Sequence, residues 1–560
     1  MLDRLPDIVL LQIWECLGPA AHSVFSNDQG WYITPLLRVC WRLYTMFMPL
    51  VHQAFHVHTG SYPRFENVPY LPFIVSATLN TCRYIHIASA IQILSVEDLF
   101  VGRIPKTPLP LDSVLLEALL QSLKALPDQV CWWREALEAG REDAWFSILL
   151  LQLPNLRKLE LKYLDANSPY LQSILSRLTD PNDPLTGLTQ LSELNFSPQM
   201  PVDCSYLSSF IPFTQLPSIR KIRLVRAIDN YQPPSFTEEG DATDLLDASS
   251  LFPILPVYQS YFHSDLTHLT LHGCSTIATL PSLLTRLPKL KSLIYRHYDR
   301  GLPQVNTQAT TDHTNQNAGI STSMRQASPV AQTQYVATST PTNILNPVEL
   351  YQGLTEASCN SLQELWVTVE RSLRMKEYER RTQDLPGIPI GDLRVFYSLR
   401  QVRIRVDNLL TVVRNGGSPQ NGHFSNVWAS NNLWDVLPLS LEGLFLEDCD
   451  RGILPVLASQ LRQVLESQVG MKEYVLFPLM TTVVLQQPID EVDRVPFVCP
   501  PNIPHYSLEA FQLEYNHRKA ANDIQPDIYA LLMALKKRFT MFDLELKVLD
   551  KWDRDETFPM

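Results

Sequence analysis

The most regular feature of the chain is a short apolar pattern that recurs along most of its length. In each copy, an apolar residue is followed three positions later by a second and five positions later by a third. The later positions alternate between two faces, which predicts a short strand entered through a turn. Clear copies are LRKLEL (156–161), LSELNF (191–196), IRKIRL (219–224), LTHLTL (266–271), LKSLIY (290–295), LQELWV (362–367), LRQVRI (399–404) and LEGLFL (441–446), with weaker ones at CRYIHI (82–87) and MTTVVL (480–485).

Helix-like stretches precede most of these copies, for example AWFSILLLQLPN (144–155) and PSLLTRLPK (281–289). A single strand–helix unit cannot bury its own apolar face, whereas stacked units can. The pattern therefore predicts an α/β fold: over residues 58–560, an irregular leucine-rich repeat solenoid with parallel strands on its concave face and helices outside.

The array is expected to contain one long insertion and an end cap. Residues 303–347 are rich in Gln, Thr, Asn and Ser and hold few apolar side chains, which predicts a disordered loop. Ser328 and Thr340 each precede a proline in this segment. They are therefore candidate sites of proline-directed phosphorylation; the alternative is that the insertion is unregulated. An amphipathic helix followed by a strand-like FDLELKV predicts a C-terminal cap at about residues 520–560.

Composition narrows the function classes. The formal charge of −12 argues against a nucleic-acid partner, which would need a concentrated basic face. The apolar runs are too short for a membrane helix. The nine cysteines are scattered and include no CxxC pair, which is typical of reduced thiols and predicts a cytoplasmic or nuclear location. Cys274 and Cys449 each follow a repeat strand by three positions, so we expect both in the repeat core.

The N-terminal segment LPDIVLLQIWECL (5–17) is apolar nearly all round. A helix of this kind must be covered on more than one side, and a module of residues 1–57 offers little surface of its own to do so. Either the repeat array or a partner protein must cover it.

This segment resembles the F-box motif, whose first helix begins with Leu-Pro and continues with the same apolar spacing. The stretch LLRVCWRLYTMFMPLVHQAFHV (36–57) resembles the second part of that motif, and the ending is similar to F-box proteins of filamentous fungi with degenerate repeats. The chain departs from the family at Ile8, at Leu43 and in the long spacing between the two parts. The residues that the resemblance assigns to adaptor binding are Leu5, Pro6, Leu10, Ile13, Trp14, Leu17, Val39, Cys40 and Leu43.

The resemblance implies a substrate-recognition subunit of an SCF-type E3 ubiquitin ligase. The F-box would bind the Skp-type adaptor, and through it a cullin, while the repeats would hold a target protein. Such a receptor is not an enzyme and needs no cofactor. The alternative is a leucine-rich repeat scaffold that acts outside a ubiquitin ligase, with the first helix merely capping the array.

The repeat register also predicts where a target would bind. Residues between the inward positions face the concave side of the sheet. Toward the C-terminal half, this column becomes aromatic and basic, the composition of binding hot spots. We expect target contacts at Ile294, Trp366, Arg403, Arg405 and Phe445, unless a loop or the C-terminal cap covers the aromatic rings.

Catalytic and metal motifs are missing from the sequence. It contains no GxxxxGK[ST] phosphate loop, no HExxH and no GxSxG. His52, His56 and His58 have the spacing of metal ligands but lack further ligands nearby, so we expect no metal site there.

Overall fold

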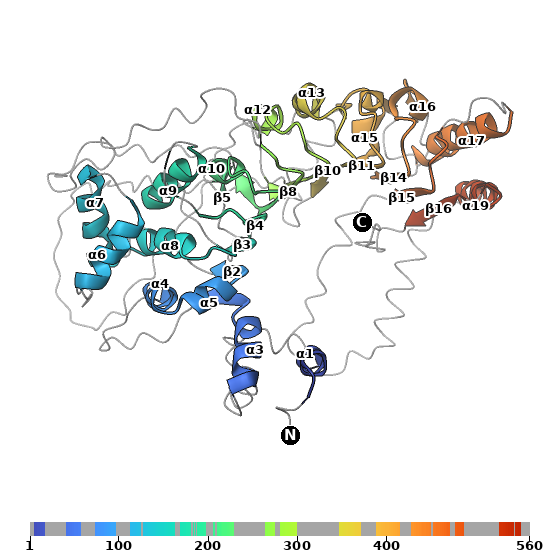
Figure 1. Cartoon of the computed structure of the whole chain (residues 1–560). Helices are drawn as coiled ribbons and strands as arrows, with labels where there is room; N and C mark the ends of the chain where they lie inside the picture. The colour runs from blue at the N-terminus through green and yellow to red at the C-terminus, as the bar shows by residue number, and fades with distance from the viewer. Residues whose placement is uncertain are drawn as a thin grey trace, which may run out of the picture.

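The computed structural model shows a curved row of strands with helices along its outer side (Figure 1). Residues 299–346, which include nearly all of the expected insertion with Ser328 and Thr340, lie outside the described part. The residues that the structure describes are 5–16, 41–57, 73–96, 113–124, 127–162, 168–180, 183, 185, 187–197, 205–207, 210–228, 264–274, 280–298, 347–370, 388–414, 427–449, 452–470, 477–486, 526–542 and 544–549.

The centre of the fold is a twelve-stranded sheet in which all neighbouring strands are parallel and follow one another in chain order. Its strands are β1 (Ala54–Val57), β2 (Ile93–Val96), β3 (Lys158–Leu161), β4 (Glu193–Phe196), β6 (Lys221–Val225), β8 (His268–Cys274), β9 (Ser292–Tyr298), β10 (Glu364–Glu370), β11 (Gln401–Arg405), β14 (Gly443–Glu447), β15 (Thr482–Gln486) and β16 (Glu545–Leu549). Two small sheets pair β5 (Ser205–Tyr206) with β7 (Ala227–Ile228), and β12 (Val412–Arg414) with β13 (Val427–Ala429).

Among the described residues, two helices precede the first strand, and helices lie between most successive strands of the sheet, as is usual for parallel pairing. They are α1 (Asp7–Cys16), α3 (Trp41–Val51), α4 (Phe73–Arg83), α5 (Ile85–Ala90), α6 (Ser113–Ser122), α7 (Pro127–Glu138), α8 (Glu142–Leu151), α9 (Pro169–Thr179), α10 (Ile211–Thr214), α12 (Leu280–Leu284), α13 (Pro347–Ala357), α15 (Val406–Leu409), α16 (Leu433–Val436), α17 (Leu454–Gly470) and α19 (Pro526–Thr540), with a 3-10 turn η5 (Leu393–Val395).

The recurrent apolar positions form the core between sheet and helices. The second position of each copy pairs in register with the same position of the next strand. Each of these side chains is at most 2% exposed, so each unit buries its apolar face on its neighbours. The ladder consists of Leu94, Leu159, Leu194, Ile222, Leu269, Leu293, Leu365, Val402, Leu444, Val483 and Leu546.

The predicted α/β arrangement with parallel strands is therefore confirmed, and so is the core position of Cys274 and Cys449, which are both fully buried. The helix and strand expected near the C-terminus are α19 and β16, and β16 ends the sheet. Among the described residues, no helix is long and apolar enough to cross a membrane.

One predicted strand is wrong. CRYIHI lies in α4 and α5, and Ile85 within it is 77% exposed. The strand of this unit is β2, in IQILSV (91–96), where the same spacing places Ile91, Leu94 and Val96 in the core with no exposure. Apolar residues three apart fit a helix as well as a strand entry, so spacing alone could not separate the two segments.

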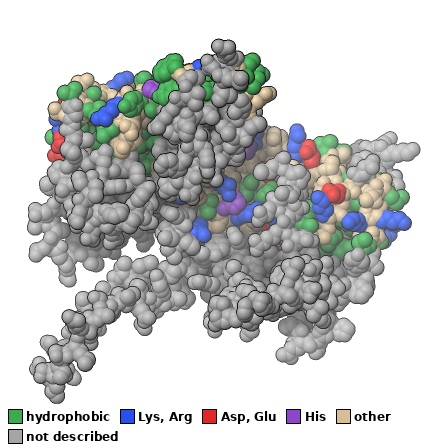
Figure 2. Space-filling view, turned by 90° about the horizontal axis from the view of Figure 1, so that it is seen from below, with side chains coloured by type: hydrophobic (Ala, Val, Ile, Leu, Met, Phe, Trp, Pro, Cys, Tyr) green, Lys and Arg blue, Asp and Glu red, His purple; other side chains and the backbone are tan. Residues whose placement is uncertain are grey.

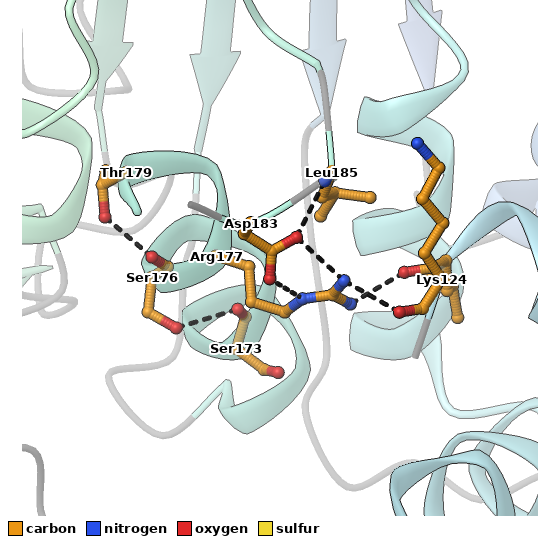
Figure 3. A network of polar contacts seen from close by, with 8 residues as sticks. Lys124, Ser173, Ser176, Arg177, Thr179, Asp183 and Leu185 are labelled. Atoms are coloured by element: carbon orange, nitrogen blue, oxygen red, sulfur yellow. Dashed lines mark hydrogen bonds and ion pairs between the residues drawn. The ribbon is translucent and has the colours of Figure 1, made fainter. Parts of the chain in front are cut away.

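Polar contacts join neighbouring units where their helices meet. Figure 3 shows Arg177 of α9 between the end of α6 and the carboxylate of Asp183. The Arg177 guanidinium donates to Leu123 O at 2.7 Å and to Lys124 O at 3.0 Å. It also donates from Nε to Asp183 Oδ2 at 2.8 Å and from Nη2 to Oδ1 at 3.1 Å. One side chain thus binds the two carbonyls that directly follow α6 and also the carboxylate of Asp183 in the segment after α9.

Candidate interaction surfaces

In the described part of the N-terminal module, an ion pair joins the two helices and three apolar side chains are buried. Asp7, in the first turn of α1, pairs with Arg42 in α3. Leu10, Leu43 and Phe47 are at most 1% exposed. The two helices precede β1 in the chain, so the module adjoins the first strand of the sheet (Figure 1).

Large apolar side chains remain on the outside of this module. Ile8 is 67% exposed, Leu11 40% and Trp41 76%. The start of α5 and the residue before it add Ile85 at 77% and Tyr84 at 49%. Apolar side chains that gather on one part of a surface mark an interaction site more often than single ones do.

The residues expected to bind the adaptor fall into three groups. Leu10 and Leu43 are buried, so they are not available to a partner in this conformation. Pro6 is exposed and Leu5 is half-buried, while Ile13 and Trp14 lie within α1. Leu17, Val39 and Cys40 lie outside the described residues.

A cavity of about 310 Å³ lies between α3 and α5. Its lining is mostly apolar, and at its edge the rings of Trp41 and Tyr44 stack with centroids 5.3 Å apart. Both ring nitrogens of His52 are buried without a hydrogen-bond partner. Burial lowers the pKa of His52, and the nearby His86 lowers it further, so this imidazole is neutral at pH 7. The lining residues are Trp41, Tyr44, Thr45, His52, His86, Ile87 and Ala90.

Sequence reasoning missed this cavity, because it is built from segments far apart in the chain. From the sequence, His52 stands out only through its spacing from His56 and His58, which is that of metal ligands. His52 instead lines the cavity, His56 lies in β1, and His58 is outside the described residues. Within the described part of the chain, no group of three or more potential metal ligands occurs.

The residues expected to bind the target are neighbours on the sheet. Ile294, Trp366, Arg403 and Phe445 occupy one register row across β9, β10, β11 and β14. The Arg403 guanidinium lies 5.1 Å from the centroid of the Trp366 ring and 4.1 Å from that of Phe445. The register prediction is therefore confirmed for this row.

The expected exposure of its aromatic rings is wrong. Trp366 is 5% exposed and Phe445 not at all. They form a small apolar cluster with Val484, and Ile294 and Leu549 pack against it. This agrees with the alternative in which the aromatic rings are covered. The cause is local packing on the concave face, which the alternation of faces along a strand does not reveal.

Charged groups beside this cluster are paired. Arg403 Nε donates to Glu447 Oε1 at 2.6 Å, and Arg405 Nε donates to Asp448 Oδ2. Burial raises the pKa of Glu447, and Arg403 opposes that shift. Both arginines are less than a quarter exposed, so these are partly desolvated pairs rather than flexible surface ones.

Comparisons with known proteins do not assign a function to these surfaces. No family model matches the chain, and no curated protein matches it significantly.

Proposed function

We propose that the chain is a non-catalytic substrate receptor of an SCF-type E3 ubiquitin ligase. In this proposal, residues 1–57 form an F-box that docks on a Skp-type adaptor and through it on a cullin. The remaining residues form a leucine-rich repeat array that holds a target protein, in the cytoplasm or the nucleus. The observation that carries the proposal is the exposed apolar surface of Ile8, Leu11 and Trp41 on a short helical module.

The physical reason is the cost of leaving such side chains in water. Fully burying one large apolar side chain contributes about 1.5–3 kcal/mol, so covering Ile8 and Trp41 with a partner would add substantially to a complex. A receptor of this kind makes or breaks no bond. It raises the effective concentration of the target at the conjugating enzyme and orients it there.

A scaffold outside a ubiquitin ligase is the second candidate. The observation in its favour is the cavity that is lined by both α3 and α5. Because residues of both helices line it, the N-terminal module lies beside the first repeating unit. A module built in this way is suited to capping the open edge of the sheet beside β1.

Co-purification with the Skp-type adaptor separates the two. Removing residues 1–57 would also remove β1, so we choose side-chain changes instead. The double variant Ile8→Glu, Trp41→Ala should weaken adaptor binding at least ~10-fold, because it places a charge and a gap in the apolar surface. Its melting temperature should fall only slightly, since both side chains are exposed and the contact that is lost is the stacking of Trp41 on Tyr44.

Val114→Glu, Tyr397→Ala is the matched control. These side chains are 75% and 71% exposed and lie in the array, away from α1 and α3. The control should bind the adaptor like the unchanged chain. If the intact chain never co-purifies with the adaptor, the ligase-receptor proposal is wrong and the scaffold function replaces it.

A further inference from the structure

The last four strands of the sheet, β11, β14, β15 and β16, are each preceded by the same kind of turn. In this turn a backbone N–H donates to the carbonyl three residues before it, at 2.9–3.3 Å. In the first three turns the residues at both ends are buried, so the turn presents a middle side chain to solvent. The donor and acceptor pairs are Leu399 N and Phe396 O, Leu441 N and Pro438 O, Met480 N and Phe477 O, and Phe542 N and Phe539 O.

Each of these four turns exposes a large apolar side chain. Each such residue lies three or four positions before the first paired residue of its strand, and those first residues pair in a single row across the four strands. The exposed side chains therefore follow one edge of the sheet from unit to unit. We refer to them as the turn stripe, which consists of Tyr397 (71% exposed), Leu439 (62%), Leu479 (53%), Met541 (73%) and Phe542 (39%).

The turn itself does not require apolar residues at its middle positions. Turns with the same hydrogen bond lead into β3, β4, β6 and β9, where none of the middle residues is a large apolar one. Those residues are Pro154 and Asn155, Thr189 and Gln190, Pro217 and Ser218, and Pro288 and Lys289. Since the fold is built equally well with polar turns, the apolar side chains of the last four units indicate an interaction site.

The turn stripe ends beside two lysines. Lys536 and Lys537 are exposed near the end of α19, which leads directly into Met541. Among the described residues neither lysine forms an ion pair, whereas Arg538 beside them pairs with Glu466. Figure 2 shows hydrophobic side chains next to Lys or Arg side chains at the end of the molecule where Figure 1 places α17 and α19. A partner that covers the stripe is therefore expected to carry acidic groups at this end.

The spacing of the turn stripe fits an α-helix better than an extended segment. Neighbouring strands lie about 4.8 Å apart, and successive turns of an α-helix rise about 5.4 Å. A helix along this edge brings one side chain to each unit, at positions i, i+4, i+7 and i+11. Side chains on one face of an extended segment are about 6.6 Å apart, so they fall out of step with the units.

We propose that the turn stripe binds an amphipathic α-helix of a partner protein. The helix lays its apolar face over the stripe, and acidic side chains at one of its ends pair with Lys536 and Lys537. That the helix belongs to a target for ubiquitination rests on the proposed function; the binding itself does not.

The test is fluorescence anisotropy of a labelled helical peptide against the full chain. The peptide carries glutamates in its first turn, leucines at i, i+4, i+7 and i+11, and alanine and glutamine elsewhere. A peptide of the same composition with its leucines spread around the helix should bind at least ~10-fold more weakly. The variant Leu439→Ser, Met541→Ser should also lose ~10-fold or more in affinity, because two apolar contacts disappear. Its melting temperature should fall only slightly, since both side chains are exposed.

Val114→Ser, Ile388→Ser is the matched control. It replaces two exposed apolar side chains outside the turn stripe and should bind the peptide like the unchanged chain. A loss equal to that of Leu439→Ser, Met541→Ser, or equal affinity for the peptide with spread leucines, would overturn the proposal.

A charge reversal tests the lysine end of the turn stripe. Lys537→Glu should weaken binding of the peptide ~5-fold or more, and should have little effect on a peptide with glutamine in place of glutamate. Arg83→Glu is the control, because it makes the same change at an exposed basic residue in the last turn of another helix, α4. Equal losses for the two variants would mean that net charge attracts the peptide, and would contradict the proposed pairing.

Analytical ultracentrifugation distinguishes a partner helix from a second copy of the chain. If the unchanged chain self-associates and Leu439→Ser, Met541→Ser abolishes the association, the turn stripe joins two copies and the proposal is wrong. It is equally wrong if the peptide does not bind. Adaptor co-purification together with no peptide binding refutes this site alone; peptide binding without adaptor refutes only the ligase receptor.

Discussion

At the scale of single residues, Arg177 is the side chain on which the junction of α6 and α9 depends. Its guanidinium makes bonds to Leu123 O, Lys124 O and Asp183 while only 14% of the side chain is exposed. Arg177→Met keeps the length of the side chain and removes all of these bonds. It should lower the free energy of unfolding by about 2–3 kcal/mol, because the carbonyls and the carboxylate lose their partner. Urea denaturation measures this.

The contact between Arg177 and Asp183 should also affect how the stability of the protein depends on pH. The Arg177 hydrogen bond holds the pKa of Asp183 below its usual value, so the folded state gains stability from ionised Asp183. That gain is present above the unfolded pKa of about 4 and is lost as the pH falls through the lowered, folded pKa. Arg177→Met should therefore destabilise the protein less at pH 3 than at pH 7.

The exposed pair of Arg394 and Asp392 is the control. Arg394 also forms bonds to both carboxylate oxygens, but its side chain is 54% exposed. Arg394→Met should lower the free energy of unfolding much less than Arg177→Met, because solvent screens an exposed pair. Equal losses for the two variants would show that the bonds from Arg177 to the carbonyls of Leu123 and Lys124 do not contribute to stability.

Residue types in the apolar copies predicted the core, but not the side chains that face the opposite way. Leu293 and Leu365 lie where the pattern places them, because stacking imposes one inward direction on every strand. The burial of Trp366 and Phe445 depends on Val484, Arg403 and Leu549, which come from other strands. No local pattern specifies such a combination.

At the scale of elements, a serine directly before the apolar copy ties four of the units to the unit before them. Ser218 donates to Leu188 O, Ser398 to Asn360 O and Ser440 to Leu399 O, at 2.7–2.9 Å. Ser361 donates to Pro288 O and Leu290 O, both at 2.9 Å. The serine joins turns that are adjacent only when the units stack, so sequence spacing did not single it out.

Ser361→Ala should therefore lower the free energy of unfolding by about 1–2 kcal/mol, the effect of leaving turn carbonyls without their donor. Chemical denaturation of the full chain measures it. Ser282→Ala, on the exposed side of α12, makes the same chemical change and should cost less than about 0.5 kcal/mol. If both variants unfold alike, the serine contacts do not hold the units together.

At the scale of the whole molecule, the order of strands makes each unit depend on its neighbours alone. β16 pairs only with β15, and α19 packs beside α17. The side chains of Leu532, Leu535, Phe539 and Leu546 are at most 4% exposed. A terminal unit of this kind shields the apolar face and the open edge of the unit before it.

Truncation after residue 525 should consequently leave β15 as an open edge beside uncovered apolar side chains of α17. We expect a lower melting temperature and concentration-dependent association in size-exclusion chromatography. The comparison is a deletion of residues 306–343, within the insertion that the sequence predicts to be a disordered loop. That larger deletion should leave the melting temperature within about 2 °C of the full chain, because loop length affects stability weakly. The opposite result would be an unchanged melting temperature for the truncation and a lowered one for the deletion. It would refute the role of the C-terminal unit as a cap and would show that the insertion stabilises the fold.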